Sequence, residues 1–137
     1  MLVKEISEQH IQDIGHAFGY YDYGEEKGMA SWFRDKEAVV TYICGFVRCM
    51  LTDGFLHTTS ERGEGYIAYK LPGQKVSFKA ARILLRGMLQ SMSLGELFHF
   101  ARMLSKAGPS LEDVLNKEKK PCIYVGMVCV REAYQGQ

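Results

Sequence analysis

The feature that most constrains the fold is an apolar run close to the end of the chain. Residues 122–130 read "CIYVGMVCV", so positions that would face opposite sides of a β-sheet are alike apolar or aromatic, apart from Gly126. Such a strand is typical of the middle of a sheet that is covered on both faces. We therefore expect a central strand here, with Gly126 marking a bulge or the close approach of another backbone.

The rest of the chain predicts helices and a hairpin around this strand. A first strand over residues 2–6 precedes a helix capped by Ser7, and a second helix starts at Asp35 and ends at Gly54. The β-forming stretches "FLHTTS" and "GYIAYKL" flank the turn "ERGEG", which predicts a hairpin. Two longer helices, a short helical turn and the final strand follow, so the expected order is β-α-α-β-β-α-α-β. In the first of these longer helices one face is apolar, made of Phe78, Ala81, Leu84, Leu85, Met88, Leu89 and Met92.

Length and composition predict a single domain spanning residues 1–137. The hydrophobic fraction of 47% and the charged fraction of 24% are those of a folded, water-soluble protein. A net charge of +1 offers no overall field for nucleic acid or a membrane, so we expect neither as a partner. The four cysteines form no CxxC pair, and no histidine lies at ligand spacing from them. We therefore expect free thiols in the cytoplasm and no metal site.

The segment after the apolar run carries a resemblance to a known family. Val130 is followed by "REAYQGQ", in which Gln135, Gly136 and Gln137 match the start of the motif Gln/Arg-x-x-Gly-x-Gly/Ala. In this pattern and in its order of elements, the chain resembles the GNAT superfamily of acyl-CoA-dependent N-acetyltransferases. The resemblance implies an α/β fold with a mixed, mostly antiparallel sheet and helices on both faces.

The same resemblance implies a cofactor site along the final strand. Acetyl-CoA would lie against Val128, Cys129 and Val130, with the Val128 N–H polarising the thioester carbonyl. Gln135, Gly136 and Gln137 would begin the turn that holds the pyrophosphate on backbone N–H groups. The acceptor would be a primary amine.

Two departures from the family pattern affect this expectation. Glu132 stands where the family usually has a proline, which places a carboxylate near the expected pyrophosphate. The remaining glycines of the motif and the family's usual tyrosine acid have no counterpart in residues 1–137. We therefore expect this chain to be a fragment of such an enzyme, truncated on its C-terminal side and inactive or poorly active alone.

Acetyl transfer to an amine also needs a base and an acid. Tyr124 on the final strand, His57 on the hairpin, and Glu25 and Glu26 in the loop after the first helix are candidates. Each has an alternative role, as a core phenol, a solvated histidine or a solvated loop charge. An aromatic cluster would either wall an acceptor pocket or anchor this loop; its members are Phe18, Tyr20, Tyr21, Tyr23, Trp32 and Phe33.

Two other interpretations stay open from the sequence. The chain can be a non-catalytic module whose unpaired strand edge captures a second copy as a homodimer. It can also be an unrelated α+β domain that binds a small ligand, in which case the terminal motif is a coincidence. The helical histidines His10, His16 and His99 lack a second ligand at metal-binding spacing, and "RGEG" at 62–65 belongs to the hairpin turn.

Overall fold

The computed structural model describes residues 1–20, 33–108 and 111–135. The helices are α1 (Glu8–Gly19), α2 (Lys36–Thr52), α3 (Phe78–Ser91), α4 (Leu94–Ala107) and α5 (Leu111–Lys117). The strands are β1 (Leu56–Thr58), β2 (Gly65–Lys70) and β3 (Tyr124–Val130), and a short 3-10 turn, η2 (Glu132–Tyr134), follows β3. The mixed α and β class and the order of the elements from α1 onward are therefore confirmed.

Side-chain caps begin the helices where the sequence predicts them. The Ser7 hydroxyl accepts the His10 N–H at 3.2 Å, and the Asp35 carboxylate accepts the Ala38 N–H at 2.8 Å. The Ser93 hydroxyl accepts the Glu96 N–H at 3.2 Å at the start of α4. Each cap satisfies a backbone donor that the first helical turn leaves without a partner.

The sheet is antiparallel, three-stranded and ordered β1-β2-β3. The strand expected over residues 2–6 is reduced to one bridge between Leu2 and His57 at the outer side of β1. In the β2–β3 register Ala68 faces Met127 and Tyr69 faces Val125, which leaves Gly126 as the extra residue. The bulge predicted at Gly126 is thus confirmed.

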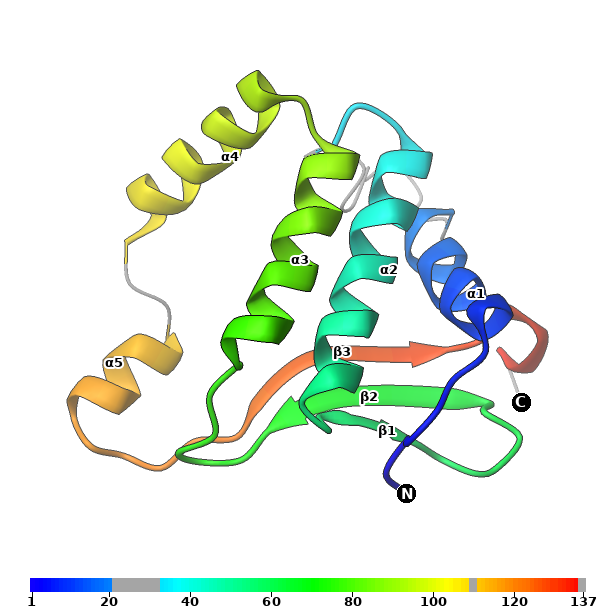
Figure 1. Cartoon of the computed structure of the whole chain (residues 1–137). Coiled ribbons are helices and arrows are strands. Elements are labelled where there is room, and N and C mark those ends of the chain that lie inside the picture. The colour runs from blue at the N-terminus through cyan, green and yellow to red at the C-terminus, as the bar shows by residue number, and fades with distance from the viewer. Residues whose placement is uncertain (21–32, 109–110, 136–137) are drawn as a thin grey trace.

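Only one face of the sheet is covered, and β3 lies at its edge. Helices α1, α2 and α3 lie on the same side of the sheet (Figure 1). The covered face consists of Leu56, Tyr66, Ala68, Met127 and Cys129, all buried. On the opposite face Val128 is 64% exposed, so the expectation of a central strand covered on both faces is wrong for the described residues. An apolar composition predicts a strand well, but it does not reveal which neighbours the strand has.

Helix α3 packs on α2 through small residues. A Cβ placed on Gly45 of α2 would lie 3.0 Å from the Cα of Gly87 on α3, so the two backbones approach closely here. The buried residues of α3 are Ala80, Gly87 and Ser91. On the apolar face expected for this helix, Phe78, Leu85 and Leu89 are exposed. Leu84 and Met88 are half-buried and Met92 is buried, so the expected face contributes to packing only in part.

Candidate functional site

The outer edge of β3 offers main-chain groups that no other described strand uses. Hydrogen-bonded and non-hydrogen-bonded pairs alternate along an antiparallel ladder. The Arg131 N–H donates to the Glu64 carbonyl at 2.9 Å, which makes the next pair, Gly65 and Val130, a non-hydrogen-bonded one. By the same alternation Val128, opposite Ile67, directs its N–H and C=O away from β2.

The pairing of β2 with β1 supports this assignment independently. The Gly65 carbonyl accepts the Thr59 N–H at 3.1 Å, and the Tyr69 N–H donates to the Phe55 carbonyl at 3.1 Å. The odd-numbered residues of β2 therefore direct their main chain toward β1 and the even-numbered ones toward β3. Val128 and Val130 face odd-numbered residues, so their peptide groups point to the open edge.

Gln135 folds back onto this edge. Its side-chain amide donates to the Val130 carbonyl at 2.9 Å. In η2 the Tyr134 N–H donates to the Arg131 carbonyl at 2.8 Å, which turns the chain back and brings Gln135 into reach. The two other residues of the terminal motif, Gly136 and Gln137, lie outside the described residues.

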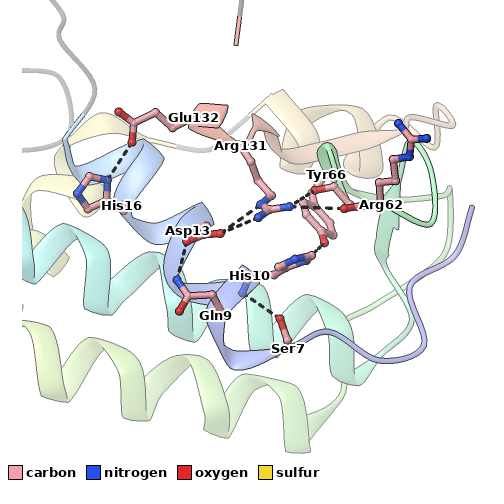
Figure 2. Close-up of polar contacts among 10 residues, drawn as sticks. Ser7, Gln9, His10, Asp13, His16, Arg62, Tyr66, Arg131 and Glu132 are labelled. Atoms are coloured by element: carbon pink, nitrogen blue, oxygen red, sulfur yellow. Dashed lines mark hydrogen bonds and ion pairs between the residues drawn. The ribbon is translucent and has the colours of Figure 1, made fainter. Parts of the chain in front are cut away.

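Arg131 joins three parts of the fold directly after β3 (Figure 2). Its guanidinium donates to Asp13 Oδ2 on α1 at 2.9 Å and 3.3 Å, and to the Gly63 carbonyl in the hairpin turn at 3.1 Å. The side chains of Arg131 and Asp13 are only 15% and 30% exposed. Because both are largely withdrawn from water, this ion pair fixes the end of β3 more firmly than a surface pair would.

The charge of Asp13 is stabilised by its neighbours. Partial burial on its own raises the pKa of this carboxyl, but the hydrogen bonds from Gln9 and Arg131 and the charges of Arg131 and His10 outweigh it, so the pKa lies below its usual value. Gln9 Nε2 donates to Asp13 Oδ1 at 2.9 Å, so both carboxylate oxygens are engaged. Asp13 is therefore an anchor for Arg131 rather than a proton acceptor at neutral pH.

A depression of about 380 Å³, lined mainly by ionisable residues, lies beside this anchor, between α1 and the turn after β3. Its lining includes Asp13, His16, Arg131 and Glu132, and His16 Nδ1 lies 3.6 Å from Glu132 Oε2. His16 also stacks on the Tyr20 ring at 4.3 Å between centroids. The depression adjoins the C-terminal end of β3, where the sequence places the pyrophosphate turn.

A second polar contact, between His10 and Tyr66, lies close to Arg131 (Figure 2). His10 Nδ1 and the Tyr66 hydroxyl are 2.8 Å apart. Tyr66 is 5% exposed, and burial raises the pKa of its phenol. A Cβ on Gly63, whose φ is +63°, would lie 2.3 Å from the Tyr66 oxygen, so the hairpin turn requires glycine here.

The two pairs of residues just described, Asp13 with Arg131 and His10 with Tyr66, were not among the site candidates from the sequence. Asp13 and Arg131 are 118 positions apart and His10 and Tyr66 are 56 apart. Each residue alone resembles an ordinary surface or core position, and no local pattern joins the partners. The one local signal was an arginine placed immediately after an apolar strand.

The acid and base candidates do not gather around the edge. Tyr124 is 38% exposed and lies at the far end of β3 from Val130, with Lys70 Nζ 4.8 Å from its ring centroid. His57 stacks on Tyr69 and its Nδ1 lies 3.3 Å from the Phe55 carbonyl. Glu25 and Glu26 lie outside the described residues. The described structure thus places neither Tyr124 nor His57 beside Val128.

The aromatic cluster is described only in part. Phe33 is buried and packs on Tyr42, Phe18 is half-buried, and the Tyr20 hydroxyl donates to Glu37. Tyr21, Tyr23 and Trp32 lie outside the described residues. Phe33 accordingly serves as a core anchor.

The cysteines are free, and three of them are buried. Burial raises the pKa of the Cys129 thiol to about 11, against the opposing effect of the Arg131 charge, so this side chain on β3 stays protonated. Cys44 and Cys49 are buried in α2, and Cys122 is half-buried. The part of Cys129 that can meet a ligand at the edge is therefore its main chain.

Comparisons with protein-family models, with curated proteins and with solved structures give no match for this chain. Among the described residues, no group of three or more histidine, cysteine or acidic side chains is arranged to hold a metal ion. In the same ranges, every helix is too short or too polar to cross a bilayer. The geometry of β3 and its surroundings is therefore the basis from which a function can be inferred.

Proposed function

We propose that this chain is the acyl-CoA-binding part of a GNAT-like N-acetyltransferase, which transfers an acetyl group from acetyl-CoA to a primary amine. The observation that carries the proposal is the open edge of β3, where the peptide groups of Val128 and Val130 point away from β2. An extended pantetheine arm carries amide groups that can pair with such an edge in the manner of an added strand.

Three features fit this ligand. The N–H of Val128 points away from β2, and its 64% exposed side chain adds an apolar surface beside it. The bulge at Gly126 bends the strand next to this position, which helps to separate β3 from any further neighbour. The depression beside η2 lies where the chain leaves β3, and Arg131 is among the residues that line it.

Two features oppose it. The Val130 carbonyl is already paired with the Gln135 amide at 2.9 Å, so a ligand that pairs with this carbonyl must displace Gln135. Glu132, which is 77% exposed, brings a negative charge toward a phosphate. Arg131 compensates little, since its charge is engaged by Asp13.

Bound acetyl-CoA would supply the activated acyl group, as a thioester. In the proposed role the Val128 N–H donates to the carbonyl oxygen of that thioester, where negative charge develops as the amine attacks. Arg131, held by Asp13 and the Gly63 carbonyl, keeps the end of β3 in place for this contact. Cys129 stays protonated in its buried position and forms no bond with the acyl group.

The test removes the Val128 N–H without removing a core contact. Proline is tolerated at a strand edge whose N–H faces away from the sheet, so Val128→Pro is expected to fold. Loss of one hydrogen bond weakens binding by about 1 kcal/mol, and the proline ring also obstructs the edge, so acetyl-CoA affinity should fall about tenfold. Isothermal titration of acetyl-CoA into the folded protein measures this.

Val128→Ala is the matched control, because it removes the same exposed side chain and keeps the N–H. It should retain most of the affinity for acetyl-CoA. If Val128→Ala and Val128→Pro bind equally well, or if the folded parent protein shows no binding, the proposed function is wrong.

The second candidate is a non-catalytic module in which a second copy pairs with the open edge of β3. The apolar surface of this edge favours it, since Val125, Val128 and Val130 are 52%, 64% and 45% exposed. Sedimentation analysis would then show a dimer that Val128→Pro dissociates, and acetyl-CoA would not shift the melting temperature.

A further inference from the structure

We propose that the outward side of α3, together with the start of α4, binds an anionic membrane surface. We call this surface the basic apolar face. Its members on α3 are Phe78, Lys79, Arg82, Leu85, Arg86 and Leu89, and on α4 they are Leu94 and Phe98. The inference is independent of the proposed acetyl transfer.

Helix α3 has its amphipathicity inverted. Ala80, Gly87 and Ser91 are buried against the fold. Phe78, Leu85 and Leu89 have the same spacing, seven residues and then four, and each lies two positions before one of the buried residues. Two positions rotate the stripe by about 200°, so the large apolar side chains lie on the side of α3 opposite its packing face. Their exposed fractions are 83%, 50% and 50%.

Large apolar side chains that are exposed next to one another normally mark an interaction surface. Helix α4 also carries large exposed apolar side chains, since Leu94 and Phe98 are 79% and 74% exposed. In Figure 1, α4 diverges from α3 instead of folding back over it. The apolar side chains of α3 are thus left uncovered by the rest of the described chain.

The charge of this region identifies the partner's chemistry. Residues 75–106 contain six lysines and arginines and one carboxylate, a formal charge of +5, whereas the whole chain has +1. The remaining residues together therefore carry −4. The exposed cations of this region are Lys79, Arg82 and Arg86 on α3 and Arg102 and Lys106 on the later turns of α4. Apolar side chains flanked by exposed cations are the pattern of helices that lie in the interface of anionic lipids.

Two other occupants fit less well. A second copy packed face to face would bring two surfaces together that each have a formal charge of +5 over residues 75–106, which is a repulsive arrangement. A single acidic helix could cover α3, but Leu94 and Phe98 on the diverging α4 would stay exposed. A lipid surface can receive side chains from both helices and needs no fixed register.

The experiment is co-sedimentation of the whole chain with phosphatidylcholine vesicles, with and without phosphatidylserine, at low and high salt. We expect binding only to the anionic vesicles, weakened by salt. Each cation near the surface contributes roughly fivefold, so Arg82→Ala with Arg86→Ala should lower the partition coefficient about 25-fold. Phe78→Ser, at an 83% exposed position, should lower it roughly tenfold.

The controls match these changes elsewhere on the chain. Lys4→Ala with Lys117→Ala alters the net charge equally, and Leu71→Gln removes a leucine that is 47% exposed in the connection after β2. Both should bind like the parent. Urea unfolding verifies that every variant is folded.

Three outcomes overturn the proposal. The first is equal binding to vesicles with and without phosphatidylserine, or no binding to either. The second is a concentration-dependent dimer that Phe78→Ser dissociates, without vesicle binding. The third is binding of a leucine- and glutamate-rich helical peptide by a protein that ignores the anionic vesicles.

Discussion

Replacing Asp13 with asparagine tests how the end of β3 is held. The change removes the charge that faces Arg131 while keeping one oxygen acceptor. Exposed ion pairs contribute about 0–1 kcal/mol, whereas breaking a fully buried pair costs about 3–5 kcal/mol. With side chains 30% and 15% exposed, this pair lies between these limits, so Asp13→Asn should lower the free energy of unfolding by about 1–2 kcal/mol.

The pH dependence gives this prediction its sign. The pKa of Asp13 is lowered in the folded protein from the ordinary value of 3.8, so its charged form contributes stability above that value. This contribution is lost as the pH falls through the folded-state pKa. The deficit of Asp13→Asn should therefore be complete at neutral pH and shrink in acid.

Urea unfolding followed by circular dichroism at neutral and acidic pH measures both effects. Glu132→Gln is the matched control, because Glu132 is 77% exposed and lies 3.6 Å from His16, and its cost should stay below about 0.5 kcal/mol. Equal stability of Asp13→Asn and the parent at neutral pH, or a deficit that grows in acid, would refute the reasoning.

Three further predictions concern the core. Gly87→Ala should cost about 1 kcal/mol despite its better helix propensity, because its Cβ would lie 3.1 Å from the Gly45 Cα; Gly95→Ala, with open space around it, should be neutral or stabilising in the same thermal melts. Tyr66→Phe should cost about 1 kcal/mol, since it removes the hydrogen bond to His10, and an unchanged urea midpoint would contradict this. Cys129 should react with iodoacetamide more slowly than the half-buried Cys122, because its thiol has a pKa of about 11; equal labelling rates in the folded protein would show that Cys129 is accessible.

Much of the local structure was predictable because its causes are local. Ser7, Asp35 and Ser93 cap helices since a hydroxyl or carboxylate reaches an N–H three residues away. The hairpin follows from β-forming runs around "ERGEG", and Gly126 marks the bulge. These signals need no knowledge of distant residues.

The neighbours of each element were not predictable in the same way. The run 122–130 reads as a strand with two covered faces, yet β3 is an edge strand with one. In α3 the largest apolar side chains predict one packing face, but Gly87 permits a close approach to Gly45, and Phe78, Leu85 and Leu89 are left exposed. Hydrophobic periodicity locates a face and does not identify what covers it.

The candidate site likewise has features with a local sequence signal and contacts between distant residues that have none. Val128 and Val130 were selected from the strand and the terminal motif and stay predictions; the register shows only that their peptide groups point away from β2. The contact between Arg131 and Asp13 spans 118 positions and had no sequence signal. The acid and base for acetyl transfer stay predictions, since neither Tyr124 nor His57 lies beside Val128 in the described structure.

Amide hydrogen exchange along β3 tests the central claim most directly. In the free protein Met127 and Cys129, paired with β2, should exchange slowly, and Val128, directed to the open edge, should exchange fast. Saturating acetyl-CoA should slow Val128 and leave Met127 unchanged. A Val128 amide that is protected without ligand, or that exchanges equally fast with and without acetyl-CoA, would contradict the account.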